Sequence, residues 1–399
     1  MTTTNPLEER LISTNVGYFL REFSISRTKY TPPGGSEIEF ADHVILIGDI
    51  LFLIQAKNRE VPSPDREREK KWYRDVVRRQ AVGQLRHTLE QLRNAPPFPN
   101  DRDEKTNIPR DLQQLRVFKI VIYNMAQALP VSLRCQKHRL DDRAGFVHIF
   151  HIDDYELVLR TLVTVPEVTD YLAYREAAAR SHTAAASVDE RALLGGFLRY
   201  DSVVEPNPSH SSFVDNLLAD SQDFDISGLL HGYRDKIYGH WTEGPLPQDV
   251  HTTSQLGPYY GVLRQLMRLP RQSLAQFKMR FLWAREKCDG EFVYPSLFGM
   301  RDPERGQSYG FVFVPIPKGK TADHANNALM NFTHLGKHHL QVDRMLGVSI
   351  RRDARDLLID WALVQTPWQP NADLDQILRE NNPFRSLTEG AQPRYHFRR

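Results

Sequence analysis

The sequence predicts an α/β protein with two domains: one with the order helix, three strands, helix, strand, followed by a second α+β domain. Three observations lead to this prediction. Two apolar runs flank Gly48-Asp49, a residue pair typical of a two-residue hairpin turn. Helical patterns precede and follow this hairpin. The composition then changes near residues 185–210, after which a separate set of helices and strands begins.

The first predicted element is an amphipathic helix ahead of the sheet. Its apolar residues recur at helical spacing, at Leu11, Ile12, Val16, Phe19, Leu20 and Phe23. Thr31–Gly35, which is rich in proline and glycine, predicts a turn. Glu37–Phe40 is then expected to form the first strand.

Val44–Ile47 and Ile50–Ile54 are expected to form the hairpin. Each run is apolar at every position, so both strands should lie in a sheet that is covered on both faces. Pairing outward from the turn places Asp42 opposite Gln55. Because side chains alternate along a strand, Lys57 should share their face, whereas Glu39 should point the other way.

A long helix is expected from about Arg66 to Arg93. Its predicted buried stripe comprises Tyr73, Val77, Ala81, Leu85, Thr88 and Leu92. Gln84 falls within this stripe and Gln80 at its edge. Strands at Arg116–Tyr123 and Phe146–Phe150 and helices at Asp153–Thr164 and Pro166–Ser181 should complete a domain over residues 1–185.

A linker is expected over residues 186–210, followed by an α+β domain over 211–399 that would serve in target recognition, dimerisation or partner docking. Its predicted helices are Ser211–Ala219, Ser227–Trp241, Pro258–Arg268, Gln272–Lys287 and Ala322–Leu340. Its predicted strands are Phe292–Phe298, Tyr309–Val314, Met345–Arg351 and Leu357–Val364. Thr321 is expected to cap a helix, since the preceding Gly319-Lys320 lacks the upstream glycine of a phosphate-binding loop.

The composition indicates a soluble protein of ordinary charge, with a net charge of +2 at pH 7. The two cysteines, Cys135 and Cys288, argue against a disulfide framework and favour the cytoplasm. We expect no signal peptide and no membrane span. Any nucleic-acid surface must therefore be a local patch of charge.

Asp42, Gln55 and Lys57 should converge at one end of the sheet. Mg²⁺ prefers hard oxygen ligands and needs few protein groups when a phosphate also binds. The Asp42 carboxylate, the Gln55 side-chain carbonyl and the Ala56 backbone carbonyl could supply such ligands for Mg²⁺ or Mn²⁺. Lys57 could then orient or deprotonate a water molecule, or stabilise charge on a phosphate.

Asp42 followed by Gln55-Ala56-Lys57 resembles the motif of the PD-(D/E)xK nuclease superfamily, the restriction-endonuclease-like fold. The Gln-x-Lys form is similar to that of Mrr-like restriction enzymes. The resemblance covers roughly the first 180 residues and implies a metal-dependent nuclease, with Asp42, Gln55 and Lys57 as catalytic residues. It also implies a metal role for Glu22, as the helical glutamate of the family, and an active-site role for Gln80 or Gln84.

The long helix is rich in positive charge. Nine basic residues in Arg66–Arg93, Arg74 and Arg78 among them, stand against four acidic ones. This excess favours a polyanion, and the resemblance favours DNA over RNA. A role in restriction or phage defence, a homodimer and a partner protein of a defence system are further arrangements that the resemblance allows.

Two alternatives remain open at this stage. The first is a non-catalytic nucleic-acid-binding or interaction module, because the neutral Gln55 replaces the more usual acid and removes a ligand charge. The second is an interaction or structural subunit in which Asp42 and Lys57 form a plain ion pair.

Spacing of the kind found in zinc sites occurs at Cys135, His138, His148 and His151. A strand, however, turns His148 and His151 to opposite faces, which argues against a zinc site.

Overall fold

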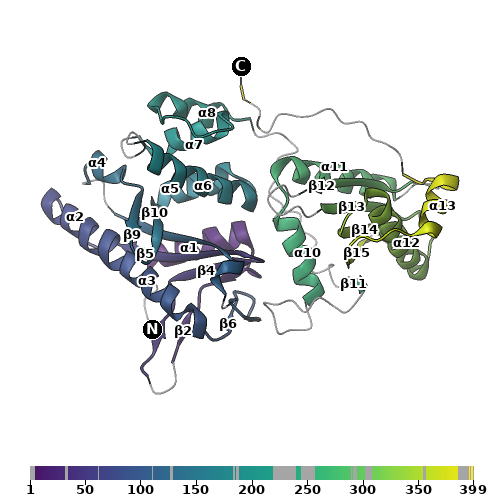
Figure 1. Cartoon of the computed structure of the whole chain (residues 1–399), viewed down its shortest axis with the longest axis horizontal. Coiled ribbons are helices and arrows are strands. Elements are labelled where there is room, and N and C mark those ends of the chain that lie inside the picture. The colour runs from purple at the N-terminus through teal and green to yellow at the C-terminus, as the bar shows by residue number, and fades with distance from the viewer. Residues whose placement is uncertain are drawn as a thin grey trace. The chain divides into compact units, whose positions relative to one another are not determined.

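In the computed structural model, the chain forms two units (Figure 1). The first contains the described residues up to 218, together with Tyr395, Phe397 and Arg398; the second contains those from 240 to 384. The described residues are 5–31, 35–61, 63–109, 111–125, 129–182, 185, 188–218, 240–243, 257–288, 290, 294–301, 308–353, 356–384, 395, 397 and 398. Within them, every helix falls short of the length and apolar character needed to cross a membrane.

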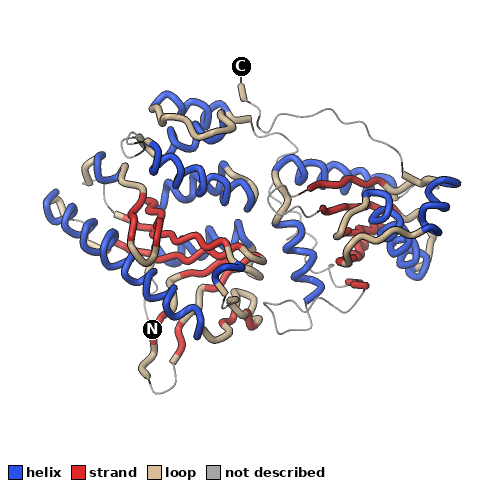
Figure 2. Tube along the Cα trace, viewed as in Figure 1, coloured by secondary structure: helices blue, strands red, loops and turns tan. Residues whose placement is uncertain are grey.

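The first unit is an α/β structure around a six-stranded sheet, with strand order β1-β4-β5-β8-β10-β9 (Figure 2). These strands are β1 (Ser24–Ile25), β4 (His43–Ile47), β5 (Ile50–Asn58), β8 (Arg116–Asn124), β10 (Gly145–His151) and β9 (His138–Asp141). β1, β4 and β5 form an antiparallel meander, and β8 runs parallel to β5.

The β4–β5 hairpin has the predicted register. Ile47 pairs with Ile50 and His43 with Ile54, so the two strands meet around Gly48, whose φ of 65° suits a glycine in a tight turn. All five residues of β4 and the first seven of β5 are buried. The sheet is therefore covered on both faces, as the uninterrupted apolar runs predict.

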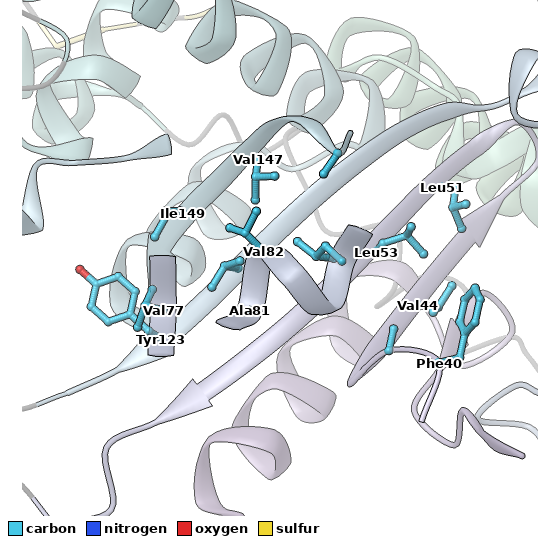
Figure 3. Packing of buried hydrophobic residues seen from close by; sticks show 14 of the residues in the cluster. Phe40, Val44, Leu51, Leu53, Val77, Ala81, Val82, Tyr123, Val147 and Ile149 are labelled. Carbon is cyan, nitrogen blue, oxygen red and sulfur yellow. The ribbon is translucent and has the colours of Figure 1, made fainter. Parts of the chain in front are cut away.

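The two faces are covered by different helices. On one face, Phe19 of α1 (Pro6–Phe19) packs against Phe52 of β5. On the other, a continuous helical segment packs Val77, Ala81 and Val82 over the sheet (Figure 3). This segment consists of α2 (Arg66–Trp72), η1 (Tyr73–Gln80) and α3 (Ala81–Gln91). η1 is a π-helix, in which Ala81 N–H donates to the Val76 carbonyl five residues earlier.

The first strand of the meander differs from the prediction. Residues Ile38–Glu39 (β3) pair with Lys29–Tyr30 (β2) in a separate two-stranded sheet, and β1 takes the expected place beside β4. Hydrogen bonds to Thr28 explain why the strand breaks before β4. Phe40 N–H donates to the Thr28 carbonyl, and Ala41 N–H donates to Thr28 Oγ1 at 3.2 Å, so the chain bends before β4. A second small sheet consists of β6 (Phe98–Pro99) and β7 (Lys105–Thr106).

Helices α5 (Ile152–Thr161), α6 (Val165–Ser181) and α7 (Glu190–Arg199) follow β10. α7 occupies residues that the sequence analysis assigned to a linker. Its Glu190 accepts hydrogen bonds from Arg175 Nε (2.9 Å) and Nη2 (3.1 Å), and both side chains are buried. Leu193 and Leu194 are buried as well. An ion pair and an apolar face therefore hold this segment in the first unit.

The end of the chain returns to the first unit beside α8 (Ser211–Asn216). Arg398 N–H donates to the Asn216 carbonyl at 2.7 Å, and the Phe213 and Phe397 rings lie 5.8 Å apart. The predicted helix Ser227–Trp241 falls mainly outside the described residues.

The second unit has a five-stranded sheet of order β11-β15-β14-β13-β12. The strands are β11 (His240–Glu243), β12 (Ser296–Arg301), β13 (Ser308–Pro315), β14 (Arg344–Asp353) and β15 (Asp356–Gln365). Its helices are α10 (Gly257–Met267), α11 (Arg271–Lys287), α12 (Ala322–Leu340) and α13 (Ala372–Asn381). α12 has the predicted bounds, and Thr321 caps it by accepting His324 N–H at 3.2 Å.

Candidate metal and phosphodiester site

Asp42 lies immediately before β4 and is tied to β5. Its Oδ2 accepts a hydrogen bond from the Ala56 backbone N–H at 2.6 Å and lies 3.6 Å from Lys57 Nζ. The side chains of Lys57 and Asp42 are 13% and 11% exposed, respectively. A charged carboxylate that accepts a backbone N–H is held firmly in place. The structure therefore brings Asp42 and Lys57 together at the end of the sheet where β5 finishes.

Gln55 points to the same side of the sheet. Leu51 and Leu53 of β5 pack against the α3 side, and alternation places Gln55 and Lys57 on that side as well. Gln55 is only 3% exposed, and its Oε1 atom has no hydrogen-bond partner in the described part of the chain. A buried carbonyl oxygen without a donor is costly, so this atom is suited to a ligand.

These donors fit a hard divalent cation. The Asp42 carboxylate and Gln55 Oε1 are oxygen ligands of the kind that Mg²⁺ selects. Among the described residues, no three His, Cys, Asp or Glu side chains form a group that could hold a metal ion. A metal here would therefore depend on one carboxylate, neutral oxygens and substrate. The Ala56 backbone takes part through its N–H, while the role of its carbonyl stays a prediction.

Glu22 lies elsewhere in the first unit. α1 ends at Phe19, so Glu22 belongs to the following turn and not to the predicted helix. Its Oε1 accepts a hydrogen bond from Arg102 Nε at 2.8 Å. The neighbouring Phe23 carbonyl accepts Leu46 N–H, which places this turn near the Gly48 end of the hairpin. Asp42 lies at the other end, about four strand residues or roughly 13 Å away. The structure does not bring Glu22 to the site.

Glu39 and Glu8 are acids that the sequence analysis did not assign to the site. The pKa of the Glu39 carboxyl is raised because burial disfavours its charge and because Asp42 and Glu8 are negative neighbours, although Lys29 and Lys57 oppose the rise. Alternation assigned Glu39 to the opposite face by assuming an unbroken strand. The bend at Ala41 removes that assumption. For Glu8, the sequence signal was the helix start at Asn5-Pro6, which places Glu8 in the first turn of α1.

His43 points to the opposite face from Asp42. It is fully buried, and neither ring nitrogen has a hydrogen-bond partner among the described residues. Burial lowers its pKa to about 3, so the ring is neutral. Two of the histidines with zinc-like spacing have other neighbours. Arg175 Nη1 lies 3.3 Å from His148 Nδ1, and His148 pairs with His138 across β10 and β9.

The long helical segment presents polar and basic side chains to solvent. Arg74, Gln80 and Gln84 are exposed, and Arg78 is partly buried with its guanidinium bonded to the Gln136 side chain. The prediction of a buried Gln84 is therefore wrong. The buried residues of α3 are Ala81, Val82, Leu85 and Thr88, so its buried face is centred toward Val82 and Leu85, and Gln84 faces solvent. Arg74 makes no ion pair with another described residue, in contrast to Arg79, which lies near Asp75.

The Gln84 turn is linked to the segment that carries Asp42. Thr88 Oγ1 donates to the Phe40 carbonyl and lies 3.0 Å from the Gln84 carbonyl. α3 is thus fastened to the chain two residues before Asp42.

Comparisons with known proteins give no family model, no curated protein and no solved structure that matches this chain.

Proposed function

We propose that the first unit is a metal-dependent nuclease of the PD-(D/E)xK type, with a Gln-x-Lys motif, that hydrolyses phosphodiester bonds in DNA. The observation that carries this proposal is the joint position of three groups at the β5 end of one sheet face: the Asp42 carboxylate, the Lys57 ammonium and the Gln55 carbonyl, which has no partner in the described part of the chain. The helix, the meander and the parallel β8 strand have the order that the superfamily resemblance implies.

The chain's own groups divide the chemistry between them. Asp42 and Gln55 would hold Mg²⁺ or Mn²⁺, which supplies a Lewis acid and a polarised water when bound. The Lys57 ammonium orients the attacking water and stabilises negative charge that develops on the phosphate oxygens. The water oxygen bonds to phosphorus, one phosphorus–oxygen ester bond breaks, and the leaving oxygen gains a proton while the water loses one.

The exposed helical surface supports a nucleic acid as substrate. Arg74 offers a charge that no described acid neutralises, and Gln80 and Gln84 offer amide donors and acceptors on the same segment. Basic residues bind phosphates, and glutamine can read an adenine edge in the major groove. These residues support DNA as the substrate. A cytoplasmic role in restriction or phage defence extends the proposal by analogy of fold alone.

A second function is favoured by one specific observation. Lys57 lies within ion-pair distance of Asp42, and the neutral Gln55 adds no ligand charge. A nuclease fold in this state could bind DNA and leave it intact. Metal-dependent chemistry and simple binding therefore have to be separated by experiment.

The test is cleavage of a supercoiled plasmid with Mg²⁺ or Mn²⁺ by the full chain. Cutting by the wild type that is lost in both Asp42→Ala and Lys57→Ala supports the nuclease. Asp142→Ala and Lys105→Ala are matched controls, because both residues are exposed and neither lies on β4 or β5. Retarded migration of DNA without cutting in either metal supports the binding module. A protein that neither binds nor cuts refutes both functions.

A further inference from the structure

The second unit repeats the element order that positions the candidate site. In the first unit, α1 is followed by the β4–β5 hairpin, the α2-η1-α3 segment and the parallel strand β8. In the second, α11 is followed by the β12–β13 antiparallel pair, α12 and the parallel strand β14. Such parallel crossovers are right-handed in almost all proteins, so the crossover helix lies on the corresponding side of each sheet.

The flanking helices cover corresponding faces. In the first unit, α1 contacts Phe52 and the crossover helix packs with Leu53, so the two helices lie on opposite faces of β5. In the second, Phe277 of α11 packs against Phe313 with ring centroids 5.0 Å apart, whereas Val312 and Val314 pack with α12. The helices therefore also lie on opposite faces of β13.

The positions that correspond to the candidate site are apolar. Leu297 pairs with Val312, and both belong to the core on the α12 side. Two residues outward on each strand lie Pro295 and Val314, followed on the β13 side by Ile316. All three are buried. They stand where the first unit has Asp42, Gln55 and Lys57, so these three described positions carry neither an acid, an amide nor a lysine.

An acid and an arginine lie within ion-pair distance of each other on this face. Asp360 of β15 lies opposite Ser349 of β14, on the side of α12, and its Oδ2 is 3.9 Å from Arg351 Nε. Burial raises the pKa of Asp360, and Arg351 opposes that rise. One acid beside an arginine is a poor site for a cation, because the guanidinium already offsets its charge. Asp360 is therefore a sharp control for a second metal centre.

We propose that the second unit is a non-catalytic counterpart of the first, so that each chain holds one metal centre and cuts one strand of a duplex per binding event. This inference rests on the proposed nuclease function. In each event one water adds to phosphorus and one ester bond breaks, so the first product of a closed plasmid is an open circle. A second strand break requires a second event or a second chain.

The first measurement counts Mn²⁺ bound to the full chain by electron paramagnetic resonance, which is independent of cleavage. One Mn²⁺ per chain, lost in Asp42→Ala and kept in Asp360→Ala, supports the proposal. Two Mn²⁺ per chain overturn it, as does one ion that survives in Asp42→Ala or disappears in Asp360→Ala. Circular dichroism of both variants confirms that each is folded.

The second measurement follows plasmid forms over time at several protein concentrations. Open circles that accumulate before linear DNA, with linear DNA arising later from them, support cutting of one strand per event. Linear DNA formed directly from the supercoiled form at every concentration overturns it. An intact plasmid together with one bound Mn²⁺ refutes the nuclease function but supports the single metal centre. An intact plasmid without bound Mn²⁺ overturns both.

Discussion

The Asp42 carboxylate and the Ala56 backbone amide are joined by a 2.6 Å hydrogen bond between the start of β4 and the end of β5. The tight turn at Gly48 joins β4 and β5 at one end of the hairpin, and this hydrogen bond joins them at the open end. It holds Asp42 beside the strand that carries Gln55 and Lys57. The candidate metal ligand is therefore also a structural acceptor, and its two roles can be separated.

Asp42→Asn and Asp42→Ala should separate these roles. Asparagine keeps an oxygen acceptor for Ala56 N–H, so its free energy of unfolding should fall by less than about 1 kcal/mol, whereas alanine leaves a buried donor unpaired and should cost about 1–3 kcal/mol. Both should lose Mn²⁺ binding and cleavage. Urea denaturation and Mn²⁺ titration measure the two effects. Full metal binding by Asp42→Asn would contradict a ligand role for the carboxylate.

Gln55→Glu should strengthen metal binding. The Oε1 atom of Gln55 is buried on the site face and has no partner among the described residues, so a carboxylate there adds one ligand charge near the Asp42 oxygens. We expect Mn²⁺ affinity to rise by about tenfold, or about 1.4 kcal/mol. Isothermal titration checks this. Gln113→Glu, at an exposed position, controls for net charge, and an equal gain in that variant would remove Gln55 from the site.

Arg74→Ala should weaken binding to DNA without regard to sequence. Arg74 is exposed on η1 and should contact a phosphate, so its loss should reduce the slope of log affinity against log salt by about 0.9. Fluorescence anisotropy at several salt concentrations measures this slope. Arg160→Ala is the matched control, because Arg160 is an exposed helical arginine on α5, which covers the other face of the sheet. Equal losses in both variants would exclude a specific surface.

Much of this fold could be predicted from local pattern. The hairpin register followed from two apolar runs and a Gly48-Asp49 turn, because a one-residue slip would expose buried side chains. Asp42, Gln55 and Lys57 met because that register fixes their face. α12 was predicted to the residue, since Thr321 caps a strongly periodic segment.

The errors have separate causes. Gln84 was assigned to the core because it lies three residues after Ala81 and four before Thr88, but the buried face of α3 extends toward Val82 and leaves Gln84 exposed. The first strand was misplaced because hydrogen bonds to Thr28 bend the chain at Ala41. α7 was taken for a linker because its buried ion-pair partner, Arg175, can be recognised only once the fold is known.

Asp154→Asn should stabilise the protein more at pH 8 than at pH 5. Burial raises the pKa of Asp154 to about 7, and negative Glu190 adds to the rise. The stability that the protonated carboxyl contributes is complete below about pH 4 and is lost as the pH rises through about 7. Asparagine imitates the protonated form and avoids this loss. The Tm difference between variant and wild type should therefore grow over this range; a constant difference would contradict a raised pKa.

Glu22→Gln should lower stability and leave metal binding and cleavage intact. The Glu22 carboxylate is 5% exposed and accepts the Arg102 Nε–H at 2.8 Å, near the closed end of the hairpin and away from Asp42. Loss of the charge should cost about 1–3 kcal/mol in the free energy of unfolding. Arg102→Gln should cost a similar amount, and the double variant should cost less than the sum of the two, because both changes remove the same interaction. Urea denaturation measures the cycle, and Mn²⁺ titration is the second readout. A Glu22→Gln protein that is as stable as the wild type but no longer binds Mn²⁺ would return Glu22 to the metal site, as the family resemblance implied.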